Sequence, residues 1–255
     1  SRLKLSAMLS GLDYHLVRNE DRYTFFHDYL LRAVEKRYLN DPARRDELWR
    51  QLVDFFEQAV VTPKSVQELV HAYSHLGDED GVLRTLSRVD RFIAMSDERS
   101  NRYEVLSAVA RMDQNRVAEA WTTALAHWER TSSPDGDEYQ STSSLVVAYL
   151  SALGKDTEAI PILDRMIDRA RLANDRGAEL AALILLSNSC TMTSALSEAR
   201  GHAARAIAIA RELGDKSTIC AALGAMSNVH LTTGELDMAL DCLDERLELL
   251  AELGD

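Results

Sequence analysis

"SNVHLTTGELDMALDCLDERLELLAELGD" occupies residues 227–255, and its apolar side chains recur at i, i+3, i+4 and i+7 spacing. They are Leu236, Ala239, Leu240, Leu243, Leu247 and Leu250. This spacing predicts a helix with one apolar stripe. Gly234 stands just ahead of it, and glycine readily adopts the left-handed backbone that ends a helix. The stretch therefore predicts a helix at 216–232, a tight turn at Gly234 and a second, antiparallel helix at 235–253.

The same features recur along the chain at an interval of 40 residues. The recurring residues are Asp175, Asp215 and Asp255, then Ala159, Ala199 and Ala239, then the turn residues Gly154, Ser194 and Gly234. An aspartate can cap the helix that follows it, and a small alanine lets two helices approach closely. One helix pair cannot bury its apolar stripe alone, whereas stacked pairs can. We therefore expect an all-α fold, with stacked antiparallel helix pairs over residues 135–255.

These repeats resemble tetratricopeptide repeats (TPR), in the longer variety typical of kinesin light chains and many bacterial signalling proteins. The matching residues are Ser187 and Ser227, Asn188 and Asn228, and Ala199 and Ala239. The chain departs from the pattern where Met166 and Arg246 replace a small alanine that is kept as Ala206, and in its repeat length of 40 rather than about 34 residues. The resemblance implies a right-handed, TPR-like superhelix that serves protein–protein interaction, with residues 116–130 as part of a degenerate fourth copy.

By the same resemblance, the first helices of the pairs line a concave groove for a protein or peptide ligand. The expected groove positions follow one helix stripe: Ser141, Ser144 and Ala148, then Ala181, Ile184, Asn188 and Thr191, then Ala221, Gly224, Asn228 and Leu231. The stripe is small and uncharged, and an Asn amide can donate to and accept from a peptide backbone. In an alternative interpretation, Asn188 and Asn228 only bond neighbouring helices. His230 is expected to pack between helices.

The first 42 residues follow a different pattern. "YHLVR" (14–18) and "RYTFF" (22–26) are rich in β-forming residues and are joined by "NED", which predicts a β-hairpin. "KLSAMLSGL" predicts a short helix before the hairpin, and "HDYLLRAVEKRYL" predicts a helix after it. Helix, hairpin and helix in this order form the closing part of a winged-helix domain, so residues 1–42 are expected to be a winged-helix remnant.

"YTFFHDYLLRAVEKRYL" resembles the end of the winged-helix domain in STAND-type signalling ATPases, the class that contains NACHT and NB-ARC proteins. In that class a Met-His-Asp motif opens this helix, and its His contacts the β-phosphate of bound ADP. The matching residues are His27 and Asp28, with Phe26 in place of Met. The resemblance implies a nucleotide-sensing role, which an imidazole can perform by hydrogen-bonding one nucleotide state. The alternative is a helix-capping Asp28 beside a partly buried His27.

Residues 43–134 look like the irregular helical pairs that follow the winged helix in such ATPases, and "TSSPDGDE" at 131–138 predicts a turn or short linker. Trp49, Phe55 and Phe56 are expected in a core rather than in a ligand stack. The sequence contains no GxxxxGKS or GxxxxGKT loop to cradle ATP phosphates, so no cofactor is expected. The resemblance implies an upstream nucleotide-binding domain that takes ADP or ATP, and a parent protein of which this chain is a fragment.

Charge and composition restrict the expected partners. The net charge is −12, and the last 22 residues hold eight acidic side chains and one base, Arg246. Such a surface repels nucleic acid and suits a basic partner.

Two uncharged stretches, 180–197 and 217–234, are interpreted as repeat helices rather than membrane spans, because both carry Ser-Asn and Thr in their middles. Three scattered cysteines and the absence of a signal peptide predict a cytoplasmic protein.

Two other function classes remain as alternatives. A TPR-containing transcription regulator would read DNA through the winged helix, but the wing "RNEDR" is charge-balanced and the first helix offers only Arg2 and Lys4. An enzyme could use His71 and His75, but they lack the adjacent Glu and the third ligand of a hydrolytic zinc site. Neither a catalytic nor a metal-binding residue is therefore expected.

The last residues, "ELGD", have the form of an internal repeat boundary. A natural array closes with a polar cap, whereas the last helix here keeps the leucines of an internal copy. We therefore expect further repeats in the parent protein, and self-association through the C-terminal repeat of this chain.

Overall fold

The computed structural model describes residues 16–19, 22–25, 32, 36–37, 40–96 and 99–254. Strands β1 (Leu16–Asn19) and β2 (Arg22–Phe25) pair antiparallel, with Leu16 opposite Phe25 and Asn19 opposite Arg22. The predicted hairpin is therefore present. The helix predicted before it lies outside the described residues, as does most of the helix predicted after it. The assignment of this segment to a winged helix stays a prediction.

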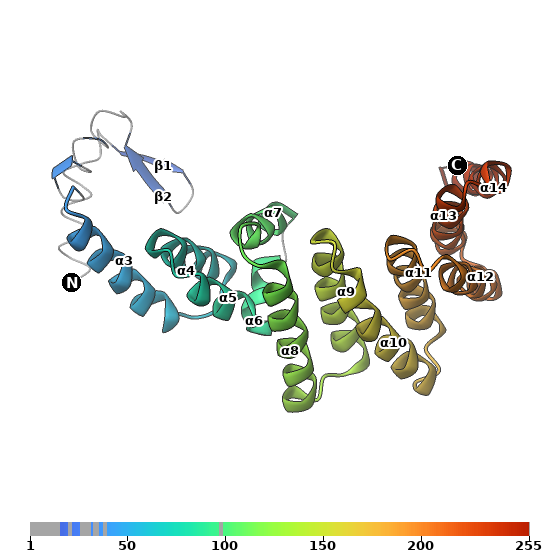
Figure 1. The fold of residues 1–255 in the computed structure, drawn as a ribbon, viewed down its shortest axis with the longest axis horizontal. Helices are drawn as coiled ribbons and strands as arrows, with labels where there is room; N and C mark the ends of the chain where they lie inside the picture. Colours follow the sequence, from blue (N-terminus) through green and yellow to red (C-terminus); the bar gives the residue numbers. More distant parts are fainter. Residues whose placement is uncertain are drawn as a thin grey trace.

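The rest of the described chain forms twelve helices, which follow one another along the long axis of the molecule (Figure 1). The first six, which we call the junction helices, are α3 (Pro42–Glu57), α4 (Pro63–Leu76), α5 (Glu79–Leu86), α6 (Val89–Ser96), α7 (Arg99–Val109) and α8 (Gln114–Ser132). The last six, which we call the repeat helices, are α9 (Gly136–Ala152), α10 (Asp156–Leu172), α11 (Arg176–Met192), α12 (Leu196–Leu213), α13 (Lys216–Thr233) and α14 (Leu236–Gly254).

Each repeat helix packs against its neighbours in sequence, as in a TPR-like array of antiparallel pairs. The pairs are α9 with α10, α11 with α12 and α13 with α14, at the interval of 40 residues that the sequence predicts. Within the stretch 131–138, residues 133–135 form the turn between α8 and α9 and the others belong to these helices, and residues 116–130 lie within α8.

The predicted caps and turns have local chemical causes. Asp135, Asp175 and Asp215 each accept a hydrogen bond from a backbone amide in the first turn of the following helix. Gly154, Ser194 and Gly234 have φ of +69°, +63° and +76°, the left-handed backbone that separates the two helices of a pair. The chain therefore reverses at each predicted position.

Small residues let the repeat helices approach closely. Ala159, Ala199 and Ala239 are almost fully buried at the start of α10, α12 and α14. Ser187 is fully buried as well, and its Oγ donates a hydrogen bond of 2.9 Å to the carbonyl of Ala199, which ties α11 to α12. Large rings pack instead where junction helices α6 and α8 meet α9, and the centroid of Phe92 lies 5.3 Å from that of Trp121 and 4.9 Å from that of Tyr149 on α9.

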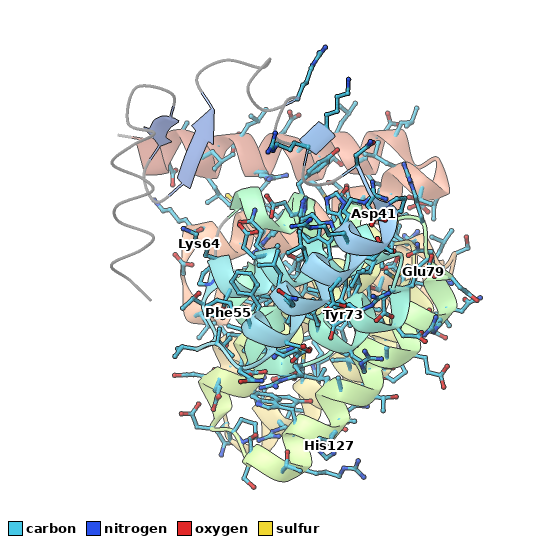
Figure 2. All side chains as sticks on the ribbon, turned by 90° about the vertical axis from the view of Figure 1, so that its left-hand side faces the viewer. Asp41, Phe55, Lys64, Tyr73, Glu79 and His127 are labelled. Carbon is cyan, nitrogen blue, oxygen red and sulfur yellow. The ribbon has the colours of Figure 1, made fainter. Side chains whose placement is uncertain are left out.

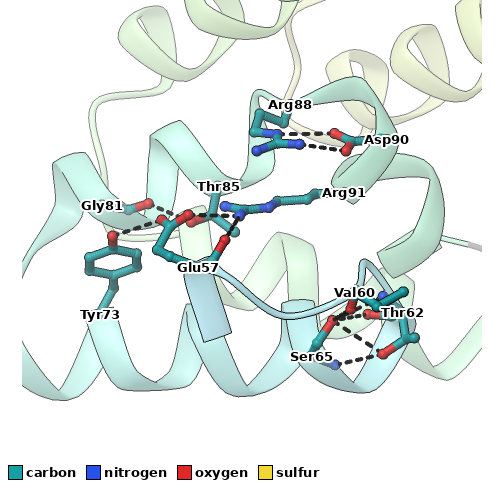
Figure 3. Close-up of polar contacts among 10 residues, drawn as sticks. All are labelled: Glu57, Val60, Thr62, Ser65, Tyr73, Gly81, Thr85, Arg88, Asp90 and Arg91. Carbon is teal, nitrogen blue, oxygen red and sulfur yellow. Dashed lines mark hydrogen bonds and ion pairs between the residues drawn. The ribbon is translucent and has the colours of Figure 1, made fainter. Parts of the chain in front are cut away.

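A polar network joins the end of α3 to α4 and α6 (Figure 3). The carboxylate of Glu57 accepts hydrogen bonds from the Tyr73 hydroxyl at 2.9 Å and from the buried Arg91 guanidinium at 2.7 Å. The bond from Arg91 is the main reason why the pKa of Glu57 lies below its ordinary value. In α5, Gly81 passes so close to the Tyr73 ring that a side chain would clash. The network therefore fixes where α3 ends against the next helices.

The expected core position of Phe55 is wrong. Phe55 is 65% exposed on α3, at the end of the array that faces the viewer in Figure 2. Phe56 packs against the core, while Trp49 is half-buried and contacts two histidines. Helical spacing places all three on α3 but does not show how little of this helix its neighbours cover.

Candidate partner-binding groove

The predicted groove positions lie on the first helices of the three pairs, α9, α11 and α13. All eleven are exposed or half-buried, and each of these helices also buries residues on another face. They are Ser141, Ser144 and Ala148 on α9, Ala181, Ile184, Asn188 and Thr191 on α11, and Ala221, Gly224, Asn228 and Leu231 on α13. We call these residues the first-helix stripe. Because α11 contacts both α9 and α13, the three segments lie on neighbouring helices and present one uncharged surface.

Two asparagines on this stripe have free side chains among the described residues. The Oδ1 atom of Asn188 is buried and has no hydrogen-bond partner there. Asn228 is exposed, and in the described chain only its backbone carbonyl accepts a side-chain hydrogen bond, from Thr232 Oγ1 at 2.8 Å. Neither amide therefore bonds a neighbouring helix, which was the alternative interpretation of these residues.

Arg246 contributes to this surface in a way that the sequence pattern did not predict. Its guanidinium extends from α14 over Gly224, where an added Cβ would lie 3.1 Å from the nearest guanidinium nitrogen. The Nε atom of Arg246 is buried and has no hydrogen-bond partner among the described residues. A sequence signal was available, because Arg246 replaces the small alanine of the repeat and Gly224 is the smallest residue of the stripe.

A buried carboxylate lies at the start of α11. Glu179 is 2% exposed, and it accepts hydrogen bonds from Arg171 on α10 at 2.9 Å, Arg176 on α11 at 2.8 Å and Arg205 on α12 at 2.6 Å. Burial raises the pKa of this carboxyl, but the hydrogen bonds from Arg171 and Arg176 and the charge of Arg205 outweigh it, so the pKa is lowered. Glu179 therefore stays charged and joins three helices.

A second polar cluster closes the turn between α13 and α14. The carboxylate of Glu235 lies 2.6 Å from His230 Nδ1 and accepts a hydrogen bond from Arg200 of α12 at 2.7 Å. These two contacts lower the pKa of Glu235 to about 2. His230 is 4% exposed and packs between helices, as predicted.

Three cavities of the described chain lie away from the first-helix stripe. One of about 380 Å³ is lined by Tyr139, Gln140 and Arg169 near the starts of α9 and α11. One of about 300 Å³ lies between α4 and α7, and one of about 390 Å³ lies between α5 and α7. None of the three is lined by a residue of the stripe, whose positions are exposed or half-buried, and such a face suits an extended ligand better than a small enclosed one.

Several expected features concern other parts of the molecule. His27 and Asp28, the nucleotide-sensing residues implied by resemblance, lie outside the described residues. Within the described ranges, no three or more His, Cys, Asp or Glu side chains are grouped to hold a metal ion. None of the helices searched in these ranges is both long and apolar enough to cross a membrane.

Comparisons with known proteins give likenesses of fold. No protein-family model and no curated protein matches the chain. Among solved structures, the nearly identical TPR-like repeats of a Podosopora anserina protein, named after kinesin light chain, share 15% identity over 74% of this chain and 95% of theirs, with a TM-score of 0.48. BtubC from P. vanneervenii shares 14% identity over 88% of this chain and 87% of its own, with a TM-score of 0.49.

A third similar structure is a signal transduction ATPase with numerous domains that has a tetratricopeptide repeat sensor, from Pyrococcus horikoshii. It shares 16% identity over 98% of this chain and 40% of its own, with a TM-score of 0.45. All three scores lie below 0.5, so the assignment of the fold depends on the helices themselves. By the pairing, caps and turns of its helices, the chain is a TPR-like helical repeat.

Proposed function

We propose that the repeat helices bind a protein or peptide along the first-helix stripe, and that this chain acts by binding rather than by catalysis. The observation that carries the proposal is the accessible, uncharged stripe on three neighbouring first helices, in a chain of which 27% is charged. Small side chains allow a ligand backbone to approach closely. In the right-handed superhelix that the sequence predicts, this stripe lines the concave side.

The polar groups of the stripe suit a peptide backbone. The exposed amide of Asn228 can donate and accept, so it can bond the carbonyl and the N–H of an extended segment, and Asn188 would do the same by turning its buried Oδ1 outward. Arg246 adds a cation beside Gly224, which favours a carbonyl or carboxylate of the ligand at that point. The open shape of the face agrees with a ligand that extends across several helices.

We further propose that this binding is coupled to an upstream nucleotide-binding domain, as in a STAND-type ATPase. This part rests on the resemblance of residues 23–39, with His27 and Asp28 at the sensing positions. A ligand can shift such an ATPase only if it prefers the open arrangement over the resting one. The coding sequence upstream of Ser1 tests it: a P-loop there supports the coupling, and a DNA-binding or receiver domain contradicts it.

The stripe is tested by blocking it with arginine. Peptides are first selected against the wild-type chain from a random phage library. Their affinities are then measured for Ala181→Arg with Ala221→Arg, on α11 and α13. The matched control is Ala204→Arg with Ala208→Arg, which adds the same two charges at exposed alanines of α12. We expect the stripe variant to lose affinity by about tenfold or more and the control to lose little.

The opposite ranking would place the binding surface on the second helices and contradict the proposal. Equal affinities for both double variants would also contradict it. A further pair of substitutions, Asn188→Ala and Asn228→Ala, tests the amides, and unchanged affinity with an intact helical circular dichroism signal would remove them from the site.

A further inference from the structure

Two histidines of α4 face each other through their Nε2 atoms. His71 and His75 lie one turn apart, both are exposed, and their Nε2 atoms are 2.9 Å apart. Their ring centroids are 4.5 Å apart, with an angle of 67° between the ring planes. The spacing of four residues puts both rings on one face of the helix. Each imidazole therefore presents its outer nitrogen to the same point in space.

Trp49 of α3 holds this arrangement from the side. Its indole stacks on the His75 ring, with centroids 4.2 Å apart and an angle of 6°, and it meets the His71 ring edge-on with centroids 5.8 Å apart. The aromatic wall comes from a helix that packs against α4, so it restricts both rings without using either Nε2 atom. A pair of ligands that is already oriented loses less conformational freedom when it binds an ion.

The separation of the two nitrogens matches chelation of one metal ion. Imidazole nitrogens bind Zn²⁺ at about 2.0–2.1 Å, and two such ligands at a right angle stand about 2.9 Å apart. A tetrahedral angle would require about 3.3 Å. Right-angle pairs occur in square-planar and tetragonal complexes, which nitrogen ligands form with Cu²⁺ and Ni²⁺. In the metal-free chain the same 2.9 Å is a hydrogen bond between the two rings, so it shows that both Nε2 atoms reach one point. The preference for Cu²⁺ over Zn²⁺ follows from the general order of affinities of nitrogen ligands for divalent ions.

The surroundings leave the remaining coordination positions open. In the described part of the chain, no third His, Cys, Asp or Glu completes a metal cluster here, so water would fill these positions. The cavity of about 300 Å³ between α4 and α7 is lined by both His71 and Glu104. The Glu104 carboxylate, which accepts two hydrogen bonds from Gln67 at 2.7 and 2.6 Å, offers negative charge near a bound cation. The positive charge of Arg45 acts on His75 and opposes it.

We propose that Nε2 of His71 and Nε2 of His75 chelate one divalent transition-metal ion, Cu²⁺ or Ni²⁺ in preference to Zn²⁺, against the wall formed by Trp49. This site is independent of the first-helix stripe, which lies on α9, α11 and α13. It also differs from a hydrolytic zinc site, because it has two protein ligands rather than three.

The test uses CuCl₂, NiCl₂ and ZnCl₂ titrated separately into the full chain, without a histidine tag, by isothermal calorimetry. Two variants remove one ligand each, His71→Gln and His75→Gln. The matched control is His127→Gln, which removes an exposed histidine of α8, labelled below Tyr73 in Figure 2. Electron paramagnetic resonance of the Cu²⁺ complex counts the coordinated imidazole nitrogens, and quenching of tryptophan fluorescence that disappears in Trp49→Phe reports the ion beside this indole.

We expect the wild type and the His127 variant to bind one Cu²⁺ with two imidazole nitrogens, and both α4 variants to bind at least about tenfold more weakly, a loss of about 1.4 kcal/mol. Affinity for Zn²⁺ should be lower than for Cu²⁺ and Ni²⁺ in the wild type. Saturable binding that is equal in all four proteins would overturn the proposal. So would the absence of saturable Cu²⁺ binding to the wild type, or a higher affinity for Zn²⁺ than for Cu²⁺. Circular dichroism confirms that each variant keeps its helices.

Discussion

The junction helices and the repeat helices build their cores from different side chains. The junction helices range from 8 to 19 residues in length and meet through large residues such as Phe92, Met95 and Trp121. The repeat helices are 17 to 19 residues long, and fully buried small residues such as Ser187, Ala199 and Ala206 stand among their larger apolar side chains. Small side chains at a contact allow a shorter distance between helix axes, and large side chains hold the axes further apart. The two halves should therefore fail under opposite kinds of substitution.

The largest effect is expected from truncating Trp121. This ring is 2% exposed and packs against both Phe92 and Tyr149, so Trp121→Ala should lower the free energy of unfolding by about 3–5 kcal/mol. Urea unfolding followed by circular dichroism measures it. Trp121→Phe is the control, because Trp121 Nε1 has no hydrogen-bond partner among the described residues and its loss should cost less than about 1.5 kcal/mol. Equal losses in both variants would show that the aromatic volume is not what holds the junction.

A smaller loss of stability, caused by adding side-chain atoms rather than removing them, is expected in the repeats. Ala206 is fully buried on α12, so Ala206→Leu should cost about 1–3 kcal/mol by forcing the helices apart. Ala208→Leu adds the same atoms at an exposed position of the same helix and should change stability little. If the buried leucine is tolerated as well as the exposed one, the repeats are less closely packed than their alanines indicate.

The smallest effect concerns pH and the turn before α14. Because the pKa of Glu235 is about 2 in the folded chain against an ordinary 4.5, its contribution to stability is present above pH 4.5 and is lost as the pH falls toward 2. Glu235→Gln should therefore unfold more easily than the wild type at pH 7, and the difference should shrink between pH 4.5 and 2. Glu248→Gln, at an exposed position of α14, is the control. A difference that does not change with pH would show that the ionised carboxylate does not stabilise the turn.

The features that the sequence predicted correctly depend on neighbouring residues. Asp175 and Asp215 cap helices that begin at the next residue, and Gly234 adopts its left-handed backbone without help from distant contacts. The first-helix stripe could be located for the same reason, because a period of 3.6 residues and a repeat of 40 fix which side chains share a face.

What could not be predicted depends on contacts between helices. A carboxylate at position 179 is expected on the surface from its chemistry alone, and only arginines from three helices explain its burial. The reach of Arg246 over Gly224, the exposure of Phe55 and the meeting of His71 with Trp49 likewise require the relative placement of two helices. A periodic pattern identifies a face but not its neighbour.

The buried Glu179 also bears on how an array of similar repeats avoids packing its helices in a register shifted by one repeat. The corresponding positions in the other copies hold Tyr139 and Ile219, so only α11 needs cations from both adjacent helices. If Glu179 occupied the corresponding position of α9, it would have Thr131 in the place of Arg171. If it occupied the corresponding position of α13, it would have Glu245 in the place of Arg205. Either shift by one repeat leaves the buried carboxylate with fewer cations, which is costly. Glu179 thus distinguishes α11 from α9 and α13, and it makes a packing of the helix pairs that is shifted by one repeat less stable.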